Sequence, residues 1–118
     1  MLTTVLIVAL IMTAIDLPYL MLIASKSFRP MIQSIQGSPV QFKMWAAIPV
    51  YLALAYLITL ANSPLKAAAI GGATYAVYDF TNLATIKNYT LPFAIQDTLW
   101  GAILFGLTFT VARYFKVL

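Results

Sequence analysis

Four long stretches of apolar residues, separated by short polar segments, make up most of the sequence. The apolar stretches cover residues 2–24, 44–61, 67–86 and 91–112. Each is close in length to the ~20 residues that a helix needs to cross the hydrocarbon core of a bilayer. The pattern predicts an all-α, integral membrane bundle of four transmembrane helices, which forms a single domain over residues 1–118.

The segments between these stretches predict the topology of the bundle. The main loop covers residues 25–43, whereas residues 62–66 and 87–90 form tight turns, so consecutive helices should run antiparallel. Both chain ends should then lie on the same side of the membrane. Within the main loop, apolar residues at helical spacing favour a short amphipathic segment in the membrane interface about as strongly as a plain loop. They are Phe28, Met31, Ile32 and Ile35.

Composition indicates the class of protein independently of the pattern. The chain of 118 residues is 63% hydrophobic and 8% charged, which leaves too little polar surface to cover a soluble globule. Its net charge of +4 comes from Lys and Arg residues near the ends of the apolar stretches. Such residues anchor helices at the membrane surface rather than bind nucleic acid. We therefore predict a multi-pass membrane protein with lipids as its direct partners.

The residue types that are missing limit the chemistry. The sequence has no Cys, no His and no Glu, so the usual ligands of zinc and haem and the commonest acid–base group are absent. We predict no metal and no cofactor. The groups left for chemistry are the three aspartates, the tyrosines and the hydroxyl residues.

A polar segment interrupts the third apolar stretch. Its members recur at spacings of three and four residues, which favours one face of a helix. They are Thr74, Tyr78, Asp79, Asn82 and Thr85. An ionisable residue that faces lipid costs several kcal/mol, so this face needs a partner from the protein or from water.

Depth along the predicted helices brings the aspartates together. At about 1.5 Å per residue, Asp16 lies roughly 12 Å from the end of the first span, Asp79 about 10 Å from the end of the third and Asp97 about 9 Å from the start of the fourth. These helix ends face the same side. We therefore predict one polar layer of the three aspartates with Tyr51, Tyr78 and Asn82. The candidates for binding or for a proton relay are these residues together with Thr81, Thr85 and Trp100.

Small residues open the third span, and three of them are candidates for helix packing: Ala68, Gly71 and Gly72. Small residues four positions apart let a second helix backbone approach closely, which drives helix association in lipid. The surface can serve within the chain or between chains. A homo-oligomer or a larger membrane assembly therefore stays open as a prediction.

Two strings in this sequence resemble a known family. They are Tyr-Asp-x-Thr-Asn-x-Ala-Thr at residues 78–85 and Asp-x-x-Trp-Gly at residues 97–101, and Asp16 adds an aspartate in the first stretch. Together they are similar to the family called domain of unknown function 2177, predicted small membrane proteins found mostly in bacteria. The resemblance implies a helical membrane fold and points to the same polar residues. The family brings no established activity.

Three classes of function fit these residues. The sequence favours a structural or accessory membrane component, cellular or of a viral internal membrane, whose polar layer fixes the order of the helices. The alternative is a proton- or cation-coupled small transporter or channel, because three aspartates placed together cannot all ionise at neutral pH. An intramembrane enzyme that modifies lipid, with aspartates as acid–base groups, is the least favoured, since no nucleophile or metal-ligand set accompanies them.

Overall fold

A computed structural model describes the whole chain, residues 1–118, as helices joined by short connections. The helices are α1 (Leu2–Tyr19), α2 (Ser25–Gln36), α3 (Met44–Thr59), α4 (Pro64–Thr85) and α5 (Leu91–Tyr114), and a π-helical turn, η1 (Leu20–Ala24), joins α1 to α2. The prediction of an all-α protein is confirmed. The longest dimension is 45 Å, close to the ~40–45 Å thickness of a bilayer with its head groups.

The first helical segment is longer than predicted. α1, η1 and α2 form one unbroken rod from Leu2 to Gln36, so helix replaces most of the loop predicted at residues 25–43. The reason lies in the apolar residues of α2, since Met31 is buried and Phe28 packs beside it against the start of α5. The helix ends at Gly37, whose φ of 76° is the left-handed conformation typical of a glycine that terminates a helix.

The turn η1 follows Pro18, which lies inside α1. Proline removes one backbone donor and crowds the preceding turn, and irregular turns such as π-bulges relieve this kind of disruption. The N–H of Ser25 donates to the carbonyl of Leu20, five residues back, which is the π-helical pattern. The widened turn lies where the rod passes the cavity described below.

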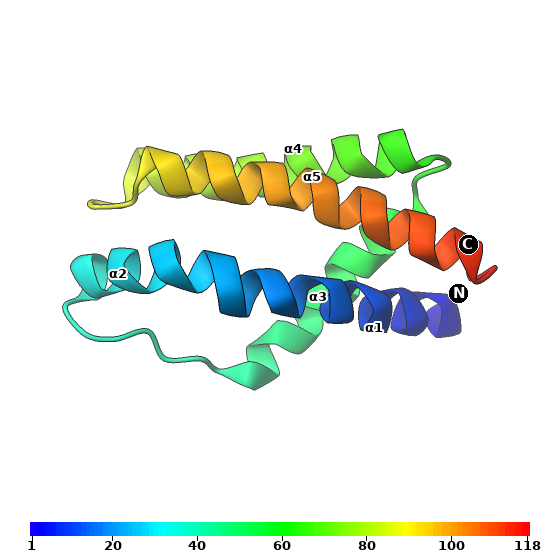
Figure 1. Cartoon of the computed structure of the whole chain (residues 1–118), viewed down its shortest axis with the longest axis horizontal. Helices are drawn as coiled ribbons and strands as arrows, with labels where there is room; N and C mark the ends of the chain where they lie inside the picture. Colours follow the sequence, from blue (N-terminus) through cyan, green and yellow to red (C-terminus); the bar gives the residue numbers. More distant parts are fainter.

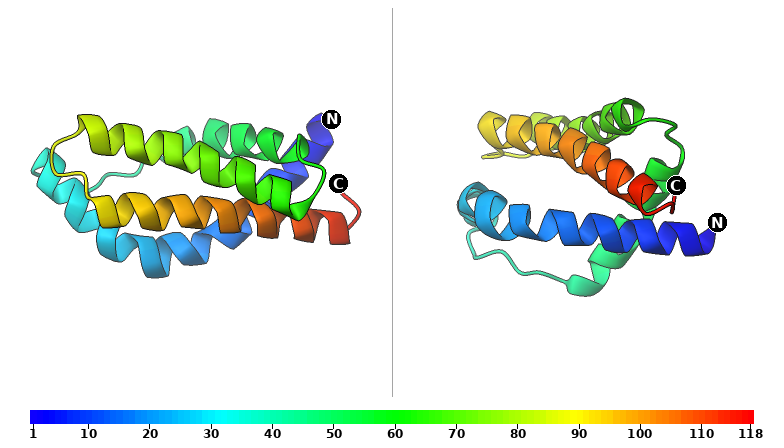
Figure 2. Two further views of the ribbon diagram at one scale, coloured as in Figure 1. Left: turned by 90° about the horizontal axis from the view of Figure 1, so that it is seen from above. Right: turned by 45° about the vertical axis from the view of Figure 1, so that its right-hand side comes forward.

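The rods pack as a bundle in which α3 crosses obliquely (Figure 1). α4 and α5 lie side by side, and α1 packs against both α3 and α5. Both chain termini lie at one end of the bundle, and the connection at residues 37–43 and the turn at residues 86–90 lie at the other (Figures 1 and 2).

Glycines bring α4 and α5 into close contact. A Cβ added to Gly71 would lie 2.3 Å from the carbonyl oxygen of Gly101, and a Cβ added to Gly101 would lie 2.3 Å from the Tyr75 ring. Gly72 and Ala68 also face α5, with more room. A Cβ added to Gly72 would lie 3.4 Å from Cβ of Ala102, and a Cβ added to Gly106 would lie 3.5 Å from Cβ of Ala68, which are ordinary contact distances. The small-residue surface of α4 is therefore used within the chain.

These contacts also set the register of the two antiparallel helices. Gly71 lies opposite Phe105, and four residues further along α4, Tyr75 lies opposite Gly101. One more step of four residues along each helix places Asp79 opposite Asp97. The close approach of α4 and α5 thus fixes which polar residues meet.

Two apolar clusters hold the ends of the bundle. The larger one, near the termini, consists of Val5, Val8, Ala9, Met12, Ala55, Ile58, Ala67, Leu104, Phe105, Phe109 and Ala112. The smaller one, at the opposite end, consists of Met31, Tyr89, Phe93 and Ala94. The buried aspartates, Asp16 and Asp79, lie between these clusters along the helices.

Two helical segments are long and apolar enough to cross a membrane, Leu2–Gln36 and Leu91–Tyr114. α3 is apolar but shorter. Large apolar side chains are exposed along these helices, among them Leu10, Ile48 and Leu99. Exposed apolar surface that extends along whole helices is typical of contact with lipid.

Candidate binding site

Asp16, near the end of α1, is buried among aromatic side chains. Its Oδ1 accepts a hydrogen bond of 2.7 Å from Nε1 of Trp100, and its Oδ2 accepts one from the hydroxyl of Tyr51. Both carboxylate oxygens therefore have donors, one from α5 and one from α3. We call Asp16, Tyr51 and Trp100 the Asp16 cluster, and it ties three helices together.

A second layer of contacts surrounds this cluster. Tyr19, one turn after Asp16, stacks on Trp100 with ring centroids 4.3 Å apart. Nε2 of Gln96 donates to the Tyr19 hydroxyl at 3.2 Å and to Oγ of Ser27 at 3.4 Å. The network thus extends from α1 through α5 to the first turn of α2, and it holds the aromatic rings in fixed positions.

Asp79, on α4, is fully buried and has a single partner. The Tyr89 hydroxyl donates to its Oδ1 over 2.6 Å, whereas Oδ2 has no hydrogen-bond partner. Tyr89 lies in the turn between α4 and α5, directly after Asn88 with its left-handed φ of 70°. Burial, followed by the hydrogen bond to Asp79, raises the pKa of the Tyr89 phenol, so the hydroxyl remains a protonated donor at neutral pH.

Asp97, on α5, is the neighbour of Asp79. The register of α4 and α5 places the two residues opposite each other. Two carboxyl groups that face each other repel when both are ionised, and a cation or a shared proton relieves that repulsion. We call Asp79 and Asp97 the aspartate pair.

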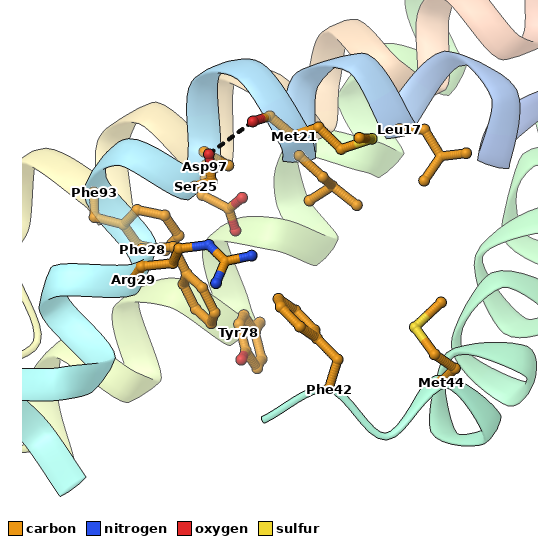
Figure 3. Close-up of a pocket in the computed structure, with 12 residues that line it drawn as sticks. Leu17, Met21, Ser25, Phe28, Arg29, Phe42, Met44, Tyr78, Phe93 and Asp97 are labelled. Carbon is orange, nitrogen blue, oxygen red and sulfur yellow. Dashed lines mark hydrogen bonds between the residues drawn. The ribbon is translucent and has the colours of Figure 1, made fainter. Parts of the chain in front are cut away.

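The aspartate pair adjoins a cavity of about 570 Å³, because Asp97 forms part of its wall. Nine of the twelve lining residues are hydrophobic, and they come mainly from α1, η1 and α2. Asp97, Tyr78 and Arg29 lie around this space (Figure 3). No member of the Asp16 cluster lines it. The two groups of aspartates therefore have different surroundings.

The predicted single polar layer is divided in the structure. Asp16 bonds to Tyr51 and Trp100, whereas Asp79 and Asp97 face each other and Asp79 bonds to the turn residue Tyr89. The three aspartates therefore do not share one hydrogen-bonded site.

Other predicted residues on α4 lie outside both groups. Tyr78 is 58% exposed and lines the cavity, and Asn82 is partly buried. Thr81 and Thr85 are exposed, and the Thr85 hydroxyl donates to the Thr81 carbonyl at 2.8 Å. None of these four residues donates a hydrogen bond to an aspartate, and their role in binding or in a proton relay stays a prediction.

The geometry of an α-helix explains why the polar face of α4 does not stay together. With 3.6 residues per turn, a step of three residues falls about 60° short of a full turn. A face drawn through Asp79, Asn82 and Thr85 therefore rotates away from the first residue. Thr81, two residues after Asp79, points to nearly the opposite side of the helix.

Two residues next to the buried aspartates, Tyr89 and Tyr19, were not predicted from the sequence. Tyr89 was assigned to a turn, although a turn that folds α5 back onto α4 brings its residues close to the buried end of α4. Tyr19 follows Asp16 by three residues, which places the two on neighbouring positions of one helix face, so its spacing was a usable signal.

The fold is all-helical, and two of its helical segments are long and apolar enough to cross a membrane. The sequence model of the family described as predicted membrane protein (DUF2177) matches residues 1–114, so the chain belongs to this family, as its polar strings predicted. No curated protein and no solved structure matches the chain.

Proposed function

We propose that the chain is a multi-pass membrane protein with four spans, and that it works as a small proton- or cation-coupled transporter. Two segments long enough to cross a membrane support the multi-pass topology, and so does α4, whose 22 residues extend over about 33 Å. α3 has 16 residues, or about 24 Å, which is short of the ~30 Å hydrocarbon core. Met44, at the start of α3, lines the cavity beside η1 and α2.

The observation that carries the transport function is the position of the aspartate pair. Asp97 borders a largely apolar cavity, and behind it Asp79 keeps one buried oxygen without a partner. A cavity of about 570 Å³ falls within the ~300–1,000 Å³ range of ligand sites. An apolar space that ends in an incompletely paired carboxyl group suits a molecule with an apolar body and a cationic group.

The pair also provides a coupling mechanism. Without a cation, the two carboxyl groups share a proton and carry one negative charge between them. A cation that enters beside Asp97 stabilises the second negative charge, so the shared proton leaves. Binding of the cation and release of the proton are therefore opposite sides of one exchange, as in proton-coupled transporters whose intramembrane carboxylates serve as relays.

The test uses a cation that has no proton to give. Dodecyltrimethylammonium is added to the purified protein in lipid nanodiscs at weak buffering, and the pH of the solution is followed with a dye. We expect up to one proton released per bound cation for the wild type and none for Asp97→Asn, which keeps hydrogen bonding but cannot exchange a proton. Thr81→Ala, at an exposed position on α4, serves as the matched control.

One outcome of the proton-release experiment would contradict the proposal. Equal cation binding without proton release in the wild type and in Asp97→Asn would exclude the aspartate pair as the coupling site. Proteoliposomes with an imposed pH gradient then test movement across the bilayer, where only the wild type and Thr81→Ala should accumulate the cation.

A structural or accessory role is the second candidate, and the Asp16 cluster favours it. Both oxygens of Asp16 are paired and the carboxyl group lies away from the cavity, so this aspartate fixes helix positions. The two roles belong to different aspartates and are compatible in one protein.

A further inference from the structure

The cavity next to the aspartate pair carries opposite charges on two of its walls. Asp97 comes from α5 and Arg29 from α2, and the Arg29 side chain points toward the space between them (Figure 3). The Arg29 guanidinium lies over the Phe42 ring, 5.5 Å from its centroid, which holds it beside the opening. A simple cation that approaches Asp97 would also meet Arg29, so the site suits a ligand with both signs of charge.

A second cavity of about 600 Å³ continues from the first one along α1 and α3. The two share four lining residues, Leu17, Leu20, Phe42 and Met44. Eleven of the twelve residues that line the second cavity are hydrophobic. Together the cavities form a continuous apolar groove with a charged end, which matches the shape of a lipid with a polar head group.

We infer that this groove binds one phospholipid with a primary amine in its head group, with the phosphate at Arg29, the ammonium at Asp97 and an acyl chain in the second cavity. The inference rests on the proposed cation exchange at the aspartate pair and names the natural ligand. The depth of the groups agrees with this placement, since Arg29 lies about 10 Å before the end of α2 and Asp97 about 9 Å after the start of α5, at the same end of the bundle.

The chemistry of the two walls separates this head group from others. An anionic head group without an amine would satisfy Arg29 but place its charge near the carboxyl groups of the aspartate pair. A choline head group, like dodecyltrimethylammonium, has no N–H, so it binds a carboxylate through its charge alone and lacks the hydrogen bonds that a primary ammonium adds. A primary ammonium offers three donors, and Asp97, which borders the cavity, provides carboxylate oxygens to accept from it.

The test measures lipid retention by native mass spectrometry after the protein is extracted from nanodiscs. The nanodiscs contain phosphatidylethanolamine, phosphatidylcholine and phosphatidylglycerol in equal amounts. We expect the wild type to retain phosphatidylethanolamine about tenfold over either competitor, a difference that corresponds to about 1.4 kcal/mol. Soluble glycerophosphoethanolamine, which lacks acyl chains, should not displace the lipid because the apolar groove is then left empty.

Single substitutions test the ammonium, phosphate and acyl-chain sites separately. Asp97→Asn should lower retention of phosphatidylethanolamine to that of phosphatidylcholine, whereas Arg29→Gln should lower retention of both. Lys26→Gln removes an exposed cation of the same helix that lines neither cavity, so it should change nothing. Ile48→Trp, at a 63% exposed position on the wall of the second cavity, should reduce retention by blocking the acyl chain. Thermal unfolding confirms that each variant is folded.

The outcomes distinguish the inference from the function on which it rests. If dodecyltrimethylammonium releases a proton through Asp97 but the three lipids are retained equally, the lipid assignment is wrong and the coupled site remains. Preference for phosphatidylglycerol that depends on Arg29 alone would also overturn the assignment. If neither proton release nor selective retention depends on Asp97, both proposals fail together.

Discussion

The two groups of buried aspartates resemble each other in sequence and differ in what the fold does with them. Asp16 receives a donor on each carboxylate oxygen, from Trp100 and Tyr51, and does not line the cavity beside Asp97. Asp79 receives one donor, faces a second carboxyl group, and reaches that cavity through it. A buried charge with complete pairing stabilises one arrangement of helices, whereas incomplete pairing leaves capacity to bind. The comparison therefore separates an aspartate that is fully paired across three helices from two whose pairing is incomplete.

The largest expected effect comes from the contact that sets the aspartate pair in register. Gly71→Ala would place a Cβ 2.3 Å from the Gly101 carbonyl oxygen, so α4 and α5 must separate, at a cost of about 3 kcal/mol. Gly72→Ala is the matched control, since its Cβ meets only Ala102 at 3.4 Å. Unfolding equilibria in mixed micelles measure both. Equal stability of the two variants would contradict the register that places Asp79 opposite Asp97.

The second effect tests the structural side of the comparison. Asp16→Ala leaves the Tyr51 hydroxyl and Trp100 Nε1 without their acceptor, and we expect a loss of about 2 kcal/mol in the free energy of unfolding. Asp97 accepts no hydrogen bond of the kind that Asp16 receives from Trp100 and Tyr51, so Asp97→Ala should lower the free energy of unfolding by less. The same micelle assay compares them. A greater loss for Asp97→Ala than for Asp16→Ala would reverse the assignment of roles.

A smaller effect is expected at the single donor of the aspartate pair. Tyr89→Phe removes the hydrogen bond of 2.6 Å to Asp79 and leaves both oxygens of that buried carboxyl group without a donor. We expect a loss of about 1 kcal/mol. Tyr56→Phe, at a 49% exposed tyrosine of α3, controls for the loss of a hydroxyl. No difference between these variants in thermal unfolding would mean that Asp79 does not depend on Tyr89.

The smallest effect concerns the two threonines that accompany Asp79 in the family string. Thr81 and Thr85 are exposed on α4, so Thr81→Ala and Thr85→Ala should each change stability by less than about 0.5 kcal/mol. They should also leave proton release at the aspartate pair unchanged. Loss of proton release in either variant would show that the functional surface extends beyond the cavity.

The sequence predicted the helical class and the family because both depend on local pattern. Runs of apolar residues predicted the helices of an all-α bundle, and the strings at residues 78–85 and 97–101 predicted the family. The sequence favoured a helix at α2 no more strongly than a plain loop because Ser, Lys and Gln separate its apolar residues, and its stability comes from packing of Met31 against Tyr89 and Phe93. When a helix is stabilised by packing against residues more than fifty positions away, its own sequence does not show that stabilisation.

The hydrophobic pattern thus determined on its own that this chain forms long apolar helices and that its aspartates need partners away from lipid, because the cost of exposing a carboxyl group to lipid acts on each residue separately. Only the tertiary structure decided which partner each aspartate received. That choice depends on the rotation and register of helices, which the contact of Gly71 with Gly101 sets for α4 and α5. It depends also on the oblique and short α3, which brings Tyr51 to Asp16 and leaves the cavity beside Asp97. Neither property is periodic along the chain, so neither could be obtained from the spacing of residues.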